Sequence, residues 1–433
     1  DVNVNGVFDI KSTVTATINS GFTVTVNDGG TIIFIGEAVL EGSGDFSLGT
    51  TATVEIGSAN GISGNLQNTG TRTLSASATY VYNGTSAQTI GTGLPNNLTG
   101  DLIINNSAGV ILNSGNPITI ANGGSLYLIN GVFNTNGVLT LLSNSSLYRT
   151  EGSLASNLPV GGTYDVYYGG GNKTTGTELS GLGLNDIYLD LNSAESTLTF
   201  GGTSKTVRNL SINTGVFEIP STSTFTVSGT LVNEGQMVIK SSSAINTGNL
   251  LASGYSGSGA VSVQRYLTDP NSWYILSSPV PGIPLQDIAI LGQLTNKGGR
   301  YPLAPYNEGS DGWDYILTSD ISSQFEAGEG YTLLDTIGNT TLTFQGFGLN
   351  TGTQTVSVDS TLYGWNALGN PYTSSISIDS FLIQNDTAIS SAYGGVYIWD
   401  HSLPTPDYVV LGLGDGNLSV GQGFIVRANA PDT

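Results

Sequence analysis

The chain has 433 residues and a formal net charge of −21, with 32 acidic and 11 basic residues. Such an acidic surface repels a phosphate backbone, so we expect no nucleic-acid partner. Cysteine is absent, which excludes disulfides and thiolate metal sites. The sequence also contains no apolar run near the roughly 20 residues of a membrane helix, so we expect no transmembrane segment.

From Phe22 onward, apolar and polar residues alternate in short runs broken by Gly and Asn-Asp turns, a pattern that predicts β-strands. The runs repeat at a step of 21 to 22 residues. Matching positions are Val24 and Phe46, Ile32 and Val54, Ile118 and Leu139, and Val216 and Val238. Short strands at this period are typical of β-solenoids, because each coil buries its inward face against the next coil.

We therefore expect an all-β chain whose residues 1–255 form an N-terminal β-solenoid, similar to a parallel β-helix. The Gly- and Ser-rich segment Ser253–Gly259 is the candidate linker at its end. The sequence shows no recognisable cap before Phe22, so we expect the N-terminal end to dock onto another subunit. Pro284–Leu294 is a weak candidate for a helix.

The rest of the chain is an internal duplication. Trp273–Pro279 returns as Trp365–Pro371 at an offset of 92 (365 − 273), and Gly328–Tyr331 returns as Gly421–Phe424 at an offset of 93 (421 − 328). The duplication predicts two tandem β-sandwich-like modules, copy 1 over 256–345 and copy 2 over 346–433. The copies share no catalytic group, which favours an architectural role.

Catalytic chemistry finds little support in the sequence. His401 is the single histidine, its match in copy 1 is Glu308, and Pro404 and Pro406 predict a loop, so we expect a solvent-exposed residue. A β-helix lyase or hydrolase needs clustered carboxylates or a carboxylate with basic groups. The basic residues of the predicted solenoid are dispersed: Lys11, Arg72, Arg149, Lys173, Lys205, Arg208 and Lys240. We therefore expect a non-enzyme.

Two binding sites are predicted in copy 1. The loop Asn307–Asp314 offers hard oxygen donors, so Glu308, Asp311 and Asp314 are candidate calcium ligands, with an ordinary polar hairpin as the alternative. Trp273 and Trp365 occupy matching positions and are expected in the core. Trp313 lies in the acidic loop, and we expect it to be exposed, which makes it the candidate for contact with a glycan.

Several segments resemble those of large secreted surface proteins of Bacteroidetes. They are Tyr82–Gly91, Asp101–Ser107, Val263–Tyr266, Trp365–Tyr372 and Val420–Arg427. The resemblance implies export by the type IX secretion system, with a C-terminal sorting domain after Thr433 that was removed or lies outside this sequence. It also implies O-glycosylation at Asp-Ser/Thr motifs, here at Thr336, Ser360 and Thr387.

These observations predict a non-enzymatic extracellular protein of the bacterial cell surface: a stalk, adhesin or filament subunit. Its expected partners are further copies of itself or another surface protein or glycan. No cofactor is expected, and calcium is the one candidate. Two alternatives remain at this point. They are a glycan-binding module and a β-helix polysaccharide lyase or hydrolase.

Overall fold

The computed structural model describes residues 1–243 and 246–429. The chain folds into two compact units, Asp1–Leu198 and Thr199–Thr433. Strands make up 45% and helices 6% of the structure. Parallel solenoid coils, about 12 in the described residues, occupy roughly the first 263 residues, and antiparallel sheets follow, which confirms the predicted fold class. The last four residues of the module predicted over 346–433 lie outside the described residues.

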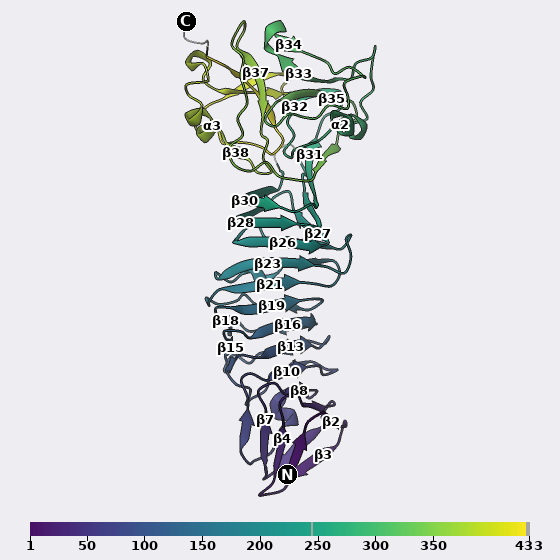
Figure 1. Ribbon diagram of the computed structural model, residues 1–433, viewed down its shortest axis with the longest axis vertical. Coiled ribbons are helices and arrows are strands. Elements are labelled where there is room, and N and C mark those ends of the chain that lie inside the picture. Colours follow the sequence, from purple (N-terminus) through teal and green to yellow (C-terminus); the bar gives the residue numbers. More distant parts are fainter. Residues whose placement is uncertain (244–245, 430–433) are drawn as a thin grey trace. The chain divides into compact units, whose positions relative to one another are not determined.

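Unit 1 is built from parallel strands that stack coil upon coil (Figure 1). Its main sheet contains, in spatial order, β2 (Val7–Ile10), β5 (Thr31–Phe34), β8 (Thr53–Ile56), β10 (Thr79–Tyr82), β13 (Asp101–Asn105), β16 (Ser125–Asn130), β19 (Ser145–Arg149), β21 (Tyr164–Tyr168) and β23 (Leu184–Asp190).

Smaller parallel sheets form the other sides of the coils in unit 1. One contains β1 (Val2–Val4), β4 (Thr23–Val26), β7 (Asp45–Leu48) and β9 (Arg72–Leu74), and a second contains β3 (Thr15–Ile18) and β6 (Val39–Gly42). Further along lie β11 (Gln88–Thr89), β14 (Val110–Ile111), β17 (Val132–Asn134) and β20 (Ser153–Leu154), and beside them β12 (Asn97–Leu98), β15 (Ile118–Ile120) and β18 (Leu139–Leu141). The remaining elements are α1 (Ile62–Asn65), β22 (Lys173–Thr174), η1 (Thr177–Leu179) and β24 (Thr197–Thr199), which ends at the first residue of unit 2.

The register between coils has the predicted step. Val24 pairs with Phe46 and Ile32 with Val54, a spacing of 22 in each case, and Ile118 pairs with Leu139 at 21. The coils begin at β1, which pairs with β4 and lies before the first part of the sequence where the alternation is clear. Alternate side chains point inward and are fully buried, and each such aliphatic side chain stabilises the fold by roughly 1.5–3 kcal/mol.

Polar side chains connect successive coils at the turns. Asn27 Nδ2 donates to Asn5 Oδ1 at 2.6 Å, and Asn144 Nδ2 donates to Asn122 Oδ1 at 3.0 Å. Both pairs are 22 residues apart, so the amides occupy equivalent places in neighbouring coils. Such amide ladders hold the register of the turns with neutral groups, which fits the low charge of the sequence.

The buried side-chain amide of Gln88 gives a structural role to Tyr82–Gly91, one of the segments that resemble secreted surface proteins. Its Nε2 donates to the carbonyl oxygens of Ile56 at 2.8 Å and Ser58 at 3.0 Å, and its Oε1 accepts from Gly84 N at 2.9 Å and from Asn106 Nδ2 at 2.8 Å. The side chain is 1% exposed. Gln88 therefore satisfies backbone groups of two coils at once, and the role of this segment is architectural.

Unit 2 begins with further parallel coils. They contain β25 (Ser204–Val207), β26 (Asn209–Thr214), β27 (Val216–Ile219), β28 (Thr224–Asn233), β29 (Gln236–Ile239), β30 (Asn249–Ser256) and β31 (Ala260–Leu267). Two expectations are corrected here. Val216 pairs with Gln236 rather than matching Val238, so the step shortens to 20. Ser253–Gly259 is not a linker, because its first four residues belong to β30, which pairs with β28.

The last coil of unit 2 is covered by the region that follows it. β31 pairs on one side with β29 and on the other, antiparallel, with β36 (Thr340–Gly346). Leu250 N, on β30, donates to the Thr373 carbonyl oxygen at 2.8 Å. The duplicated region therefore caps the coils of this unit, as unpaired strand edges require.

The two copies of the duplicated region have the same topology. In copy 1 the sheet order is β32 (Ser272–Leu276), β35 (Tyr331–Asp335), β33 (Leu303–Asn307), β34 (Gly312–Trp313), and in copy 2 it is β37 (Trp365–Gly369), β42 (Gly423–Arg427), β39 (Val396–Asp400), β40 (Asp407–Leu411). The helices α2 (Leu285–Leu291) and α3 (Ile378–Gln384) also correspond, and α2 confirms the helix predicted within Pro284–Leu294. Short elements complete the region: η2 (Glu308–Ser310), β38 (Ile376–Ser377), η3 (Ser391–Tyr393) and β41 (Asn417–Leu418).

The copies face each other about an approximate twofold axis. Ser277 N donates to Gly421 O at 3.1 Å, and the equivalent contact runs from Gly369 N to Gly328 O at 2.8 Å. Equivalent residues thus exchange equivalent bonds, as in an isologous dimer. Each helix of the described chain is too short or too polar to cross a lipid bilayer.

Replacing Gln88 by Ala tests the architectural role of its amide. The change leaves the buried Gly84 N without its acceptor and removes one of the two donors to each of the Ile56 and Ser58 carbonyl oxygens, so we expect the free energy of unfolding to fall by about 2–4 kcal/mol. Urea unfolding followed by circular dichroism measures the loss. Gln236→Ala, at an exposed strand position, is the matched control and should change stability by less than about 0.5 kcal/mol. Equal losses for the two variants would contradict the assignment.

Candidate functional site

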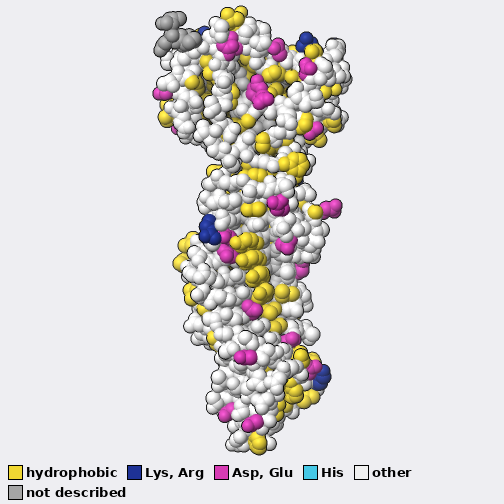
Figure 2. Space-filling model, in the orientation of Figure 1, with side chains coloured by type: hydrophobic (Ala, Val, Ile, Leu, Met, Phe, Trp, Pro, Cys, Tyr) yellow, Lys and Arg dark blue, Asp and Glu magenta, His cyan; other side chains and the backbone are white. Residues whose placement is uncertain are grey.

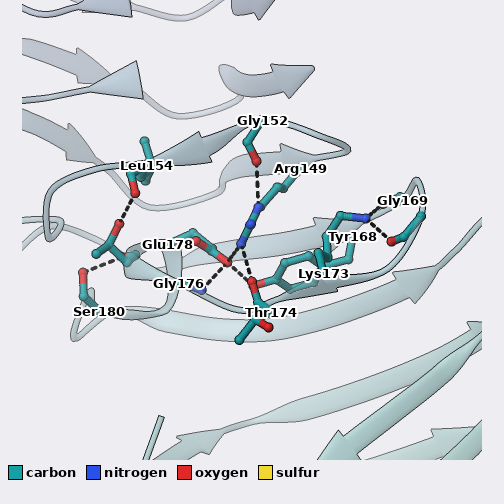
Figure 3. A network of polar contacts seen from close by, with 12 residues as sticks. Arg149, Gly152, Leu154, Tyr168, Gly169, Lys173, Thr174, Gly176, Glu178 and Ser180 are labelled. Atoms are coloured by element: carbon teal, nitrogen blue, oxygen red, sulfur yellow. Dashed lines mark hydrogen bonds and ion pairs between the residues drawn. The ribbon is translucent and has the colours of Figure 1, made fainter. Parts of the chain in front are cut away.

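A network of charged and phenolic side chains in unit 1 lies around Arg149 and Glu178 (Figure 3). Arg149 ends β19, Tyr168 ends β21, and Glu178 lies in the 3₁₀ turn η1. Arg149 Nη1 lies 2.5 Å from Glu178 Oε1, and the Tyr168 hydroxyl donates to the same oxygen at 2.7 Å. The three groups form one buried polar network.

The position of Arg149 follows from the alternation of its strand. Leu147, two residues earlier, points inward, so Arg149 stands at an interior position. Its register neighbours in the adjacent coils are Leu128 and Tyr168. A cation in an otherwise apolar column requires a partner, because an isolated buried charge is very costly. Glu178 supplies that partner.

Glu178 is committed to structure. Its side chain is 0% exposed, and its Oε1 accepts from Arg149, Tyr168 and the backbone N of Gly176 at 2.8 Å. Arg149 also donates through Nε to Gly152 O at 2.8 Å and through Nη1 to Thr174 O at 3.0 Å. Glu178 Oε2 is buried without a described partner. A carboxylate closed off from solvent in this way cannot exchange protons with a substrate at the surface.

Two further charged groups lie on the same coils. Lys173 Nζ donates to the carbonyl oxygens of Gly169 at 2.6 Å and Gly171 at 2.5 Å, and Glu151 Oε1 accepts from Gly171 N at 2.8 Å. Burial lowers the pKa of Lys173. The expectation that basic residues are dispersed is therefore wrong for Arg149 and Lys173. The inward register of Arg149 after Leu147 is the sequence signal that could have revealed the site.

An outward-facing column of tyrosines crosses the main sheet of unit 1. Tyr127, Tyr148, Tyr167 and Tyr188 are register neighbours in four successive coils. Their ring centroids are 4.6, 4.5 and 4.6 Å apart and their planes are within 16° of parallel. Figure 2 shows hydrophobic side chains gathered over this part of the sheet. We name these four residues the tyrosine ladder.

The geometry of the tyrosine ladder limits what it can bind. Each inner ring has both faces covered by its neighbours, so a sugar ring cannot stack on it, and the ladder presents ring edges and hydroxyls. Burial, followed by the nearby Tyr148, Asp165 and Tyr188, raises the pKa of Tyr167 to about 12. Its hydroxyl therefore stays neutral at ordinary pH. The stacked rings of the column connect neighbouring coils.

The structure does not bring the three predicted calcium ligands into one site. Glu308 is buried, and its Oε1 accepts from the backbone N of Leu362 and Gly364 at 2.7 Å each and from that of Tyr363. Asp311 accepts from the Tyr306 hydroxyl, and Asp314 accepts from Asn307 Nδ2. Within residues 1–243 and 246–429, no group of three or more His, Asp or Glu side chains is arranged to hold a metal ion.

Trp313 is half-buried, which corrects the expectation of an exposed ring. Its ring meets that of Tyr306 edge to face at 5.2 Å, and it packs against the cluster around Ile275 and Ile425. In copy 2 the corresponding strand pair holds Trp399 opposite Tyr408 in the same edge-to-face manner at 5.0 Å. Trp313 is thus the structural counterpart of Tyr408. Trp273 and Trp365 are likewise half-buried, at equivalent places on β32 and β37.

His401 is mostly buried rather than exposed, since its side chain is 14% accessible. Nε2 lies 2.9 Å from Asp269 Oδ2 and 3.4 Å from Thr268 Oγ1, and the ring rests on Tyr274 at 4.4 Å. A catalytic relay uses one ring nitrogen for the carboxylate and the other for the nucleophile. Here both contacts fall on Nε2, and Nδ1 is buried without a partner among the described residues, so the groups do not form a relay.

The predicted glycosylation sites differ in exposure. Thr336 and Thr387 are exposed, whereas Ser360 is half-buried. The preceding residue Asp335 is buried, and its carboxylate accepts from the backbone N of Ile337 at 2.9 Å and of Gly338 at 3.2 Å. Thr336 therefore stands on a turn that the Asp335 carboxylate stabilises through these two hydrogen bonds.

Comparison with known proteins gives one family. The model of a family described as a domain of unknown function (DUF8693) matches residues 185–410, just over half of the chain. Searches of curated proteins and of solved structures gave no match.

A double-mutant cycle tests whether the Arg149–Glu178 pair is structural. Arg149→Leu leaves a buried carboxylate without its cation, so we expect a loss of about 3–5 kcal/mol in the free energy of unfolding, and Arg149→Leu with Glu178→Leu should lose clearly less. Denaturation curves of four proteins, the wild type, Arg149→Leu, Glu178→Leu and the double variant, measure this. Lys11→Leu, which breaks the exposed pair with Asp9, is the control and should cost below about 1 kcal/mol. A double variant as unstable as the sum of its parts would contradict a coupled pair.

Proposed function

The chain belongs to the DUF8693 family, whose function is unknown, and from its geometry we propose that it is a non-enzymatic extracellular protein of the bacterial cell surface, a stalk, adhesin or filament subunit. The observation that carries the proposal is the burial of the Arg149–Glu178 network. The coils that bring acid and base together close these groups off from solvent and use them to hold coils in place.

The surface of the coils supports the same role. Neutral amide pairs such as Asn5 with Asn27 connect the turns, and the tyrosine ladder joins four coils on the outside. A fold stabilised by such repeated neighbour contacts resists local opening, which suits a protein that bears load or presents a surface. Export by the type IX secretion system, as in Bacteroidetes, is part of the proposal. The sequence resemblance alone supports it.

Contact with further copies of the chain or with another surface protein or glycan is also proposed. Among the described residues β2 has one partner strand, β5, and it carries the exposed side chains Val7, 71% accessible, and Phe8, 40% accessible. Apolar side chains on such a strand edge favour association. O-glycosylation at Thr336, Ser360 and Thr387 belongs to the same proposal, and the exposed hydroxyls of Thr336 and Thr387 support it best.

Immunogold electron microscopy of producing cells, combined with turnover assays on the purified full chain, tests the proposal. We expect label on the cell surface and no new reducing or unsaturated ends from a panel of neutral and acidic polysaccharides. Surface label with turnover that is lost in Glu178→Gln would establish the lyase or hydrolase alternative instead. Label confined to the cell interior would also refute the proposal.

A further inference from the structure

The first module shows how a strand completes this fold. β36 pairs antiparallel with β31, and its inward residues Leu342 and Phe344 are 0% exposed. The Phe344 ring lies 5.8 Å from that of Phe325, and α2 packs against β36. A Cβ on Gly346 would lie 2.7 Å from the Pro281 carbonyl oxygen, so the strand rests directly on the segment that leads into α2.

Among the described residues, the second module contains a segment that resembles β31 in sequence and has no partner strand. Val356-Ser357-Val358 repeats Val261-Ser262-Val263, and in each copy this triplet precedes the tryptophan that starts the sheet. Residues 353–358 belong to no strand. Gln354 N donates to the Tyr372 hydroxyl at 3.1 Å, but within the described chain the backbone groups of 355–358 have no hydrogen-bond partner. An extended segment with free backbone groups is a template for another strand.

A groove of about 540 Å³ lies beside this segment. Val356 and Val358 line it together with Phe381 on α3 and with Phe424 and Val426 on β42. Residues 371–376, which precede α3 as residues 279–284 precede α2, contribute Pro371, Tyr372 and Ile376 to the lining. The groove thus lies among the counterparts of the residues on which β36 rests in the first module.

The chemistry of the groove defines its occupant. None of its lining residues is charged, although the chain carries a net charge of −21. The residues of β36, Thr-Thr-Leu-Thr-Phe-Gln-Gly, are also uncharged. An apolar groove beside a free strand edge binds an extended peptide, because main-chain bonds supply affinity and alternate side chains fill the pockets.

We propose that the second module is a strand-acceptor site, which binds an extended uncharged peptide with large apolar residues at alternate positions, antiparallel to residues 353–358. The peptide supplies to α3 and to residues 353–358 what β36 supplies to α2 and β31. This inference goes beyond the passive role proposed above and does not depend on it.

A peptide with the sequence of residues 340–346, labelled with a fluorophore, tests the site by anisotropy against the full chain. We expect saturable binding, and binding weakened by about tenfold or more when the peptide carries Leu342→Ser and Phe344→Ser, since both pocket-filling side chains are lost. Amide hydrogen exchange should show new protection within residues 355–358 when the peptide is bound.

Two adjacent positions on α3 give matched protein variants. Gln384 lines the groove and Ile383, 64% exposed, does not. Gln384→Trp should weaken peptide binding by about tenfold or more, and Ile383→Trp should leave it within about twofold.

Any of three binding results would overturn the proposal, and a competition result, given last, would do so too. The three are no saturable binding, equal binding of the serine-substituted peptide, and equal binding by the Gln384→Trp and Ile383→Trp variants. The last result would also reveal a peptide that displaces β36 from β31, because that exchange does not use the α3 groove. Displacement of the bound peptide by a neutral oligosaccharide would assign the groove to sugars instead and would equally refute the proposal.

Discussion

Backbone pairing between successive coils, with inward side chains stacked on their counterparts about 22 residues away, is the interaction on which the rest of the structure depends. Pairs such as Ile32 with Val54 place like residues in one column. Every other feature of unit 1 follows this register, including the amide pairs at the turns, the tyrosine ladder outside and the polar network inside. Because each coil contacts its neighbours, a substitution is felt locally and along its column.

The interior of the coils determines what the charged residues can do. Arg149 and Glu178 meet in an environment of low dielectric constant, where each charge is stable because the other is present. The Tyr168 hydroxyl and the backbone N of Gly176 also donate hydrogen bonds to the Glu178 carboxylate. The same side chains on an open groove would form an acid–base site. Enclosed by the coils, they hold β19, β21 and η1 together.

The sequence predicted the periodic parts of the fold well and the isolated parts poorly. Alternation and the 22-residue step gave the register of Val24 with Phe46, and the duplication gave two modules with one topology. The burial of His401 and Trp313 was missed, because each packs against residues far away in the chain. The Arg149–Glu178 pair was missed since its members are 29 residues apart on elements of different type. A single contact between residues far apart in the chain produces no periodic pattern in the sequence, so it cannot be predicted from periodicity.

Amide hydrogen exchange on the native full chain tests the central claim most directly, because it reports the pairing of each coil separately. The account predicts slow exchange for the main-sheet strands of unit 1 from β8 to β21, where each strand has neighbours on both sides, and fast exchange for residues 355–358, which lack partners among the described residues. Main-sheet amides that exchange as fast as those of residues 355–358 would contradict it.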